Sequence, residues 1–220
     1  MIKHELIDRS PARFFEQAIN GGLKPGEIGV LTSIKGLGKT SVLVQLGLDR
    51  LLQGKQVVHV SFNQQSDFVM SWYEDIFAEI SKRKNAKEVN DIKNEIMKKR
   101  VVLNFNQDNI GASQIVKTLK ALATGGISTD YLYIDGLDFS KVTNENIATF
   151  KEYAKEAKLT IWFSCNTDGK LPAILDKLDA IVTLEQKPDV IEMNVAKVRG
   201  EAITDRNLKL DSKTLLISLK

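Results

Sequence analysis

Short apolar runs alternate along this chain with segments whose apolar residues recur at helical spacing. The runs are 26–32, 56–62, 100–105, 130–135 and 159–165, and the helical segments are 10–20, 40–53, 67–97 with a break near Asn85, 113–123 and 144–157. This alternation is typical of an α/β protein with a mostly parallel sheet flanked by helices. Because the runs are nearly continuous in Val, Ile, Leu and Phe, we expect these strands to be buried on both faces.

The pattern changes after residue 171. Three short β segments, 179–184, 189–198 and 215–219, follow one another without helical segments between them. They predict a C-terminal antiparallel β extension at one edge of the sheet. We therefore predict a single domain over residues 1–220, with an N-terminal helical lead-in (1–25) and a β-hairpin extension (178–220).

The amino-acid composition argues against several classes of protein. The chain has 31 Lys and Arg against 28 Asp and Glu, and a net charge of +3 is too small to indicate a nucleic-acid partner. One cysteine and two histidines allow neither an intrachain disulfide nor a Cys/His metal cluster. No apolar run approaches a membrane span, so we expect a cytoplasmic protein without a membrane partner. The charged stretch 79–100 predicts a solvated helical pair packed on the sheet, in preference to a nucleic-acid site, and an interaction surface there is the alternative. A protein partner stays open.

Residues 33–40 lie between the first strand and the following helix and read Ser-Ile-Lys-Gly-Leu-Gly-Lys-Thr. This is the phosphate-binding P-loop pattern with serine in place of the first glycine. Gly36 and Gly38 permit backbone conformations that turn N–H groups toward a phosphate, and the helix adds its N-terminal dipole. Lys39 is expected to reach the β and γ phosphates, and the Thr40 hydroxyl is expected to bind Mg²⁺.

The predicted nucleotide-binding residues are Ser33, Lys35, Gly36, Leu37, Gly38, Lys39, Thr40 and Ser41. The predicted metal ligands are Thr40 and Asp135, because Asp135 ends the run 130–135 and the carboxyl ends of parallel strands meet at one sheet edge. The implied ligands are ATP, or another nucleoside triphosphate, and Mg²⁺. Asp138 is the second candidate for the metal, although we expect it to be a turn or cap residue.

Residues 19–62 resemble the opening of the RecA-superfamily ATPases, nearest to the KaiC and DnaB-helicase branches. The likeness extends through Asp135 to "TIWFSCN", where Asn166 falls at a polar sensor position, and to "AKVRGEAI". There Lys197 and Arg199 match a Lys-x-Arg pair that reaches a neighbouring subunit's nucleotide. The resemblance implies a RecA-like P-loop NTPase domain and a homo-oligomer with nucleotide at the subunit interface. The alternative for the pair is an ordinary hairpin cap.

The acid that the resemblance implies after the second strand is missing. In the resembled branches a glutamate there polarises the attacking water, whereas this chain has Asn63 and Gln64. Amides can hold a water through hydrogen bonds but cannot accept its proton. We expect Asp67 to be a helix N-cap, and Glu74 is the alternative source of a base.

We therefore predict an ATP-binding regulatory or assembly protein in which hydrolysis is slow or absent. The alternatives are an active ATPase of the KaiC/DnaB type, such as a motor, and a DNA-associated recombinase or helicase accessory. The DNA alternative is not favoured, because neither 136–146 nor 166–179 is a long basic loop or offers an aromatic stacking platform.

Overall fold

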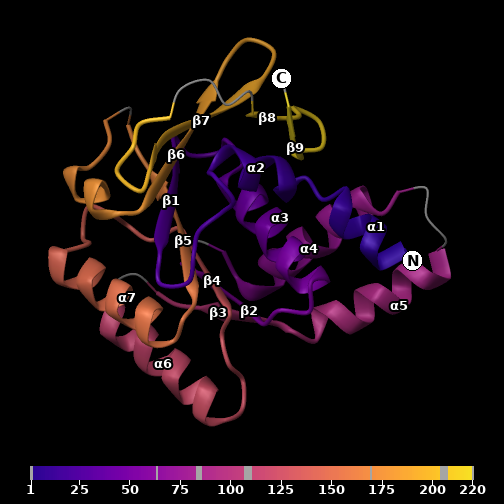
Figure 1. Ribbon diagram of the computed structural model, residues 1–220, viewed down its shortest axis with the longest axis horizontal. Coiled ribbons are helices and arrows are strands. Elements are labelled where there is room, and N and C mark those ends of the chain that lie inside the picture. The colour runs from indigo at the N-terminus through magenta and orange to yellow at the C-terminus, as the bar shows by residue number, and fades with distance from the viewer. Residues whose placement is uncertain are drawn as a thin grey trace.

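A nine-stranded sheet runs through the computed structural model, with the order β3-β2-β4-β5-β1-β6-β7-β8-β9 (Figure 1). The structure describes residues 2–62, 64–82, 86–106, 111–168, 170–203 and 208–219. The strands are β1 (Ile28–Ser33), β2 (Val57–Ser61), β3 (Arg100–Asn104), β4 (Tyr131–Asp135), β5 (Thr160–Asn166), β6 (Ala180–Gln186), β7 (Ile191–Val198), β8 (Leu208–Leu210) and β9 (Ile217–Leu219). The first six pair in parallel, and the last three add antiparallel pairs. The predicted α/β architecture is confirmed.

Helices cover both faces of this sheet (Figure 1). The helices are α1 (Ile2–Asp8), α2 (Ala12–Ala18), α3 (Lys39–Leu52), α4 (Ser66–Ile80), α5 (Ala86–Met97), α6 (Ala112–Thr124), α7 (Asn144–Glu156) and the short 3-10 helix η1 (Ala173–Lys177). Apolar residues of α1–α5 pack in one core layer, and those of α6, α7 and η1 pack in the other. None of the helices in the described part of the chain has both the length and the apolar character needed to cross a bilayer.

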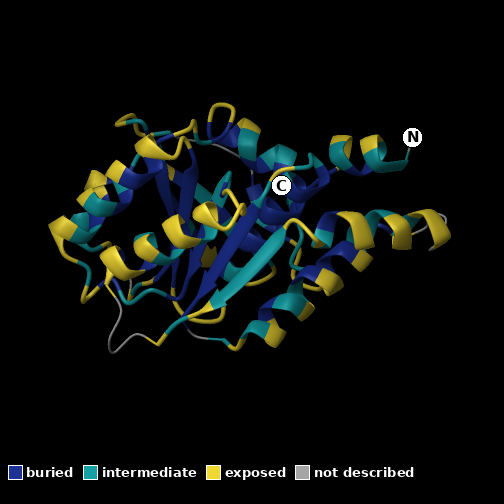
Figure 2. Ribbon diagram, turned by 90° about the horizontal axis from the view of Figure 1, so that it is seen from below, coloured by how far each residue is buried: buried dark blue, intermediate teal, exposed yellow. Residues whose placement is uncertain are grey.

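The central strands are buried on both faces, as their continuous apolar runs predict. All residues of β1 and β2 are buried, and exposed residues gather on the outer sides of the helices (Figure 2). Phe163 in β5 contacts Phe139 and Phe150 edge-on, with ring centroids 5.6 and 5.2 Å apart. The sheet is therefore a rigid support for the loops at its carboxyl edge.

The structure differs from the sequence prediction of the fold in two details. The lead-in contains two separate helices, because residues 9–11 form a turn that includes Pro11 between α1 and α2. In the C-terminal extension the structure adds β8, a strand of three residues that is too short to give an alternating pattern. The predicted break in the segment 67–97 is confirmed by the separation of α4 from α5, although Asn85 itself lies outside the described residues.

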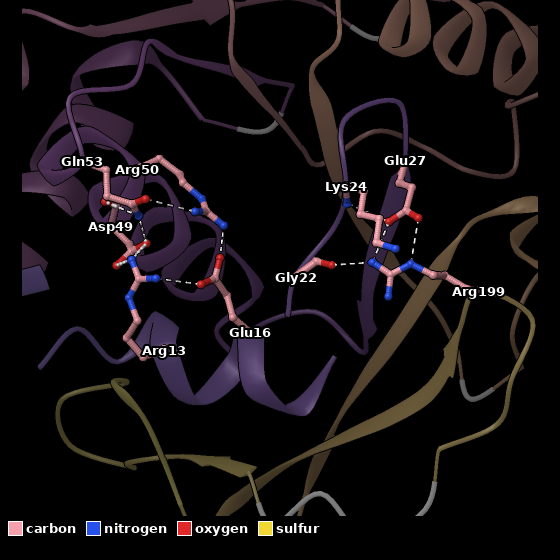
Figure 3. A network of polar contacts seen from close by, with 9 residues as sticks. All are labelled: Arg13, Glu16, Gly22, Lys24, Glu27, Asp49, Arg50, Gln53 and Arg199. Carbon is pink, nitrogen blue, oxygen red and sulfur yellow. Dashed lines mark hydrogen bonds and ion pairs between the residues drawn. The ribbon is translucent and has the colours of Figure 1, made fainter. Parts of the chain in front are cut away.

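An ion network fastens the lead-in to the core (Figure 3). The Arg13 guanidinium donates to both carboxylate oxygens of Asp49, at 2.6 and 2.5 Å, and to Glu16 at 2.9 Å. Glu16 also accepts from Arg50, and Gln53 donates to Asp49 at 2.6 Å. The Asp49 side chain is only 1% exposed. Burial raises its pKa, and the charge of Arg13 opposes this effect.

We expect Asp49→Ala to lower the free energy of unfolding by about 3 kcal/mol, because it removes the buried carboxylate that binds Arg13 through both oxygens and leaves the partly buried Arg13 charge with Glu16 alone. The matched control is Glu156→Ala, which removes an exposed ion pair with Lys120 and should cost about 1 kcal/mol or less. Urea denaturation of both variants measures the difference. Equal losses would show that the network does not hold α2 to α3.

A buried histidine lies under the helical layer that contains α3 and α4. His59 in β2 is fully buried, and its Nδ1 lies 3.2 Å from the Tyr73 hydroxyl. The described residues offer its Nε2 atom no hydrogen-bond partner. Burial lowers the pKa of His59 from 6.5 to about 4; the nearby charge of Asp135 opposes this shift, and that of Arg100 adds to it.

This histidine predicts acid destabilisation. The unfolded chain takes up a proton at His59 below pH 6.5, whereas the folded chain resists it until about pH 4. Stability is therefore fully present above pH 6.5 and falls by about 3 kcal/mol as the pH drops through this window. We expect His59→Gln to flatten that part of the curve and His4→Gln, an exposed control, to leave it unchanged. Urea denaturation between pH 7.5 and 4 measures the slope, and an unchanged slope in His59→Gln would contradict the assignment.

Candidate functional site

The glycine-rich loop joins β1 to α3 at the carboxyl edge of the parallel strands. Gly36 and Gly38 have φ values of +91° and +89°, which L side chains rarely adopt. A Cβ at Gly38 would also lie 3.0 Å from the Leu210 Cδ1 atom. Both glycines are therefore required by the loop, as the sequence predicts, and α3 begins directly after the second one.

The Lys39 ammonium is folded back onto the loop that precedes it. It donates to the Ser33 carbonyl at 3.1 Å, to the Ser33 Oγ atom at 2.7 Å and to the Ile34 carbonyl at 2.9 Å. Lys39 is 7% exposed. Burial lowers its pKa, and the charge of Asp135 opposes this effect.

The two predicted metal ligands are in contact. The Thr40 hydroxyl donates to one carboxylate oxygen of Asp135 at 2.7 Å, and the Ser164 hydroxyl donates to the other at 2.5 Å. Ser164 also accepts from the backbone N–H of Gly136 at 2.8 Å. Asp135 is 5% exposed, so these bonds fix the orientation of its carboxylate.

These groups share one cleft of about 430 Å³. It is lined by Lys35, Gly36, Gly38, Lys39, Thr40, Ser41, Gln64, Trp72, Asp135, Ser164, Asn166 and Leu215. The predicted residues Ser33 and Leu37 are not part of this lining: Ser33 lies beneath Lys39, and Leu37 packs against the core. Asn166 is beside the loop because β5 pairs with β1, with Ser33 opposite Asn166.

Asp135 is the single carboxylate in the lining of this cleft, as far as the described residues go. Gln64 follows β2 and is held by Ser61, whose hydroxyl accepts from the Gln64 N–H at 3.1 Å. The Gln64 Oε1 atom is buried, and no donor among the described residues reaches it. Asn63, the other predicted amide, lies outside the described residues.

Glu74 and Asp67, two acids that follow β2 in the sequence, have other places in the structure. Glu74 lines a separate hollow between α4 and α5 and pairs with Lys93 at 2.9 Å, so it does not line the P-loop cleft. The prediction that Asp67 is an N-cap is wrong, because α4 begins at Ser66 with Gln65 in the cap position. Asp67 lies in the first turn, where its charge suits the helix dipole. Asp138 is a turn residue as expected, since its Oδ1 atom accepts from the Ser140 N–H at 3.0 Å.

The C-terminal turn forms one wall of the cleft. Ser41 and Gln45, one turn apart on α3, both donate to the Leu215 carbonyl, at 3.0 and 2.9 Å. The Gln45 side chain also accepts from the Ile217 N–H at 2.8 Å. We predicted that Ser41 contacts nucleotide. In the structure its hydroxyl proton is directed to the Leu215 carbonyl. Ser41 remains part of the cleft lining.

Lys197 and Arg199 lie at the opposite edge of the sheet from the cleft. β7 runs antiparallel to β6, so its end lies beside the beginning of β1. Arg199 donates to Glu27 at 2.8 Å and to the Gly22 carbonyl at 2.7 Å (Figure 3), and Lys197 donates to the Asp176 carbonyl at 2.6 Å. A role for the pair at the nucleotide of another copy stays a prediction.

No protein-family model matches the chain, and a search among curated proteins finds no match.

Three residues of the cleft carry no signal in the sequence. Ser164 reaches Asp135 because β5 pairs with β4, which only the strand order shows. Trp72 lies on α4 and Leu215 lies in the C-terminal turn, far from the loop along the chain. Neither position belongs to a local motif.

Proposed function

We propose that this protein binds a nucleoside triphosphate with Mg²⁺ in the P-loop cleft and acts as a regulatory or assembly protein that hydrolyses it slowly or not at all. The observation that carries the proposal is that Lys39 and the Thr40–Asp135 pair meet in one cleft, at the end of a glycine loop and the start of a helix. Such helix starts favour phosphate, because free N–H groups and the helix dipole attract negative charge.

The donor set fits Mg²⁺. Thr40 and Asp135 would hold the ion, which takes oxygen ligands and keeps several waters and phosphate oxygens in its shell. The described residues hold no group of three or more His, Cys, Asp or Glu side chains that could bind a metal by themselves. One carboxylate and one hydroxyl are sufficient when a triphosphate supplies the remaining oxygens. The bound ion would neutralise phosphate charge.

Slow hydrolysis is supported by the chemistry of the cleft. Both carboxylate oxygens of Asp135 accept hydrogen bonds, from Thr40 and from Ser164. In this proposal Asp135 therefore holds the metal and does not act as the general base. Gln64 is part of the cleft lining, and an amide side chain can hold a water through hydrogen bonds but cannot take its proton. Without a general base, the rate falls by about 10² to 10⁴. An active ATPase is the second candidate, favoured by the meeting of Lys39, Thr40 and Asp135 in one cleft.

Thermal unfolding with ligand tests the binding. We expect Mg·ATP at about 100 times its dissociation constant to stabilise the fold by about 2.7 kcal/mol, a rise of several degrees in Tm. Adenosine, which lacks the phosphates, is the control and should give a much smaller shift. A parallel titration with GTP compares the binding of a guanine nucleotide with that of the adenine nucleotide. No shift with either triphosphate would contradict the proposal.

A further inference from the structure

The serine at the first loop position has a direct contact with the P-loop lysine. The Ser33 Oγ atom accepts from the Lys39 ammonium at 2.7 Å and donates to the Ile34 carbonyl at 2.8 Å. Ser33 is buried, lies at the end of β1 and does not line the cleft. Its hydroxyl therefore acts on the site through Lys39.

The hydrogen bonds of Lys39 are fully used in this arrangement. An ammonium has three N–H donors, and all three are directed at Ser33 and Ile34. A phosphate oxygen must therefore displace one of these acceptors before it can bind Lys39. The Ser33 carbonyl is fixed at the strand end, where it also accepts from the Thr167 N–H at 3.0 Å. The Ile34 carbonyl also belongs to the backbone, whereas the Ser33 hydroxyl turns about a single bond and can release Lys39 without any movement of the backbone.

We infer that Ser33 is a positioning residue that lowers the affinity of the site for phosphate, because its hydroxyl competes with the ligand for Lys39. This inference rests on the proposed nucleotide site and names how its affinity is set. A glycine in this position offers no side-chain acceptor, so the third N–H of Lys39 would remain available to phosphate. The serine thus stabilises the unliganded arrangement, and a ligand must overcome that stabilisation.

The test is isothermal titration of the full chain with Mg·ATP and, separately, with inorganic pyrophosphate. We expect Ser33→Ala and Ser33→Gly to bind both ligands about 3- to 10-fold more tightly than the wild type. Ser33→Thr, which keeps the hydroxyl, should retain the wild-type affinity. The matched control is Ser81→Ala, which removes another buried hydroxyl, one that donates to the Phe77 carbonyl at 2.7 Å far from the cleft, and should change nothing.

A double-mutant cycle separates positioning from a general effect on structure. In a Lys39→Met background, Ser33→Ala should no longer raise the affinity, since the group through which Ser33 acts is gone. An equal gain in that background would overturn the inference, as would unchanged or weaker binding by Ser33→Ala and Ser33→Gly. If the wild type binds Mg·ATP while these variants do not gain affinity, the inference fails and the proposed function stands. If no variant and no wild-type sample binds either ligand, the proposed function fails as well.

Discussion

Gln64→Glu is expected to raise the rate of phosphate release from Mg·ATP by about 10²- to 10⁴-fold, because it supplies a carboxylate where the cleft has an amide. The new side chain has nearly the same shape as glutamine and lies at the end of β2, within the lining of the cleft. The backbone of this residue is held by the Ser61 hydroxyl, so the substitution should leave the loop in place. A continuous phosphate-release assay on both proteins measures the change.

The matched control is Gln65→Glu, the same substitution one residue further along. Gln65 is exposed, occupies the cap position of α4 and does not line the cleft. We expect this variant to release phosphate at the wild-type rate. If Gln64→Glu binds Mg·ATP but shows no faster release, the missing base is not what limits hydrolysis. Release by the wild type at ordinary enzymatic turnover would favour the active ATPase.

Lys39→Met is expected to weaken the binding of Mg·ATP by roughly 10- to 100-fold. The methionine keeps the apolar part of the buried side chain and removes the ammonium, whose charge-assisted bond to phosphate contributes about 1.5–3 kcal/mol. The comparison is with Lys55→Met, because Lys55 is exposed between α3 and β2, at the sheet edge away from the cleft. Titration calorimetry measures both affinities. Equal affinities in the two variants would place the triphosphate outside the P-loop cleft.

The strands and the contact between the two predicted metal ligands follow from the sequence for a clear physical reason. A strand buried on both faces needs a continuous apolar run, so β1, β2, β4 and β5 are visible in the chain. Parallel strands end at a common edge, so a carboxylate at the end of β4 is expected beside the loop after β1. The contact of 2.7 Å between Thr40 and Asp135 confirms that they lie together.

The remaining features of the site depend on packing that no local pattern records. Ser164 is one of several polar residues in apolar runs, and only the order β4-β5 brings it to Asp135. The C-terminal turn reaches the cleft because Gln45 bonds to Leu215 and Ile217, a contact between residues about 170 positions apart. The bond from Lys39 to the Ser33 hydroxyl follows from side-chain orientation, so the serine appeared in the sequence as a mild departure from a motif.

We expect the cleft to hold an intact triphosphate. Equilibrium dialysis of the full chain against Mg·ATP, followed by chromatographic separation of the nucleotides in the protein chamber, tests it most directly. We expect an excess of about one equivalent of ATP per chain, which remains unhydrolysed over hours and is largely lost in Lys39→Met. No excess of nucleotide, or an excess present as ADP with free phosphate, would contradict it.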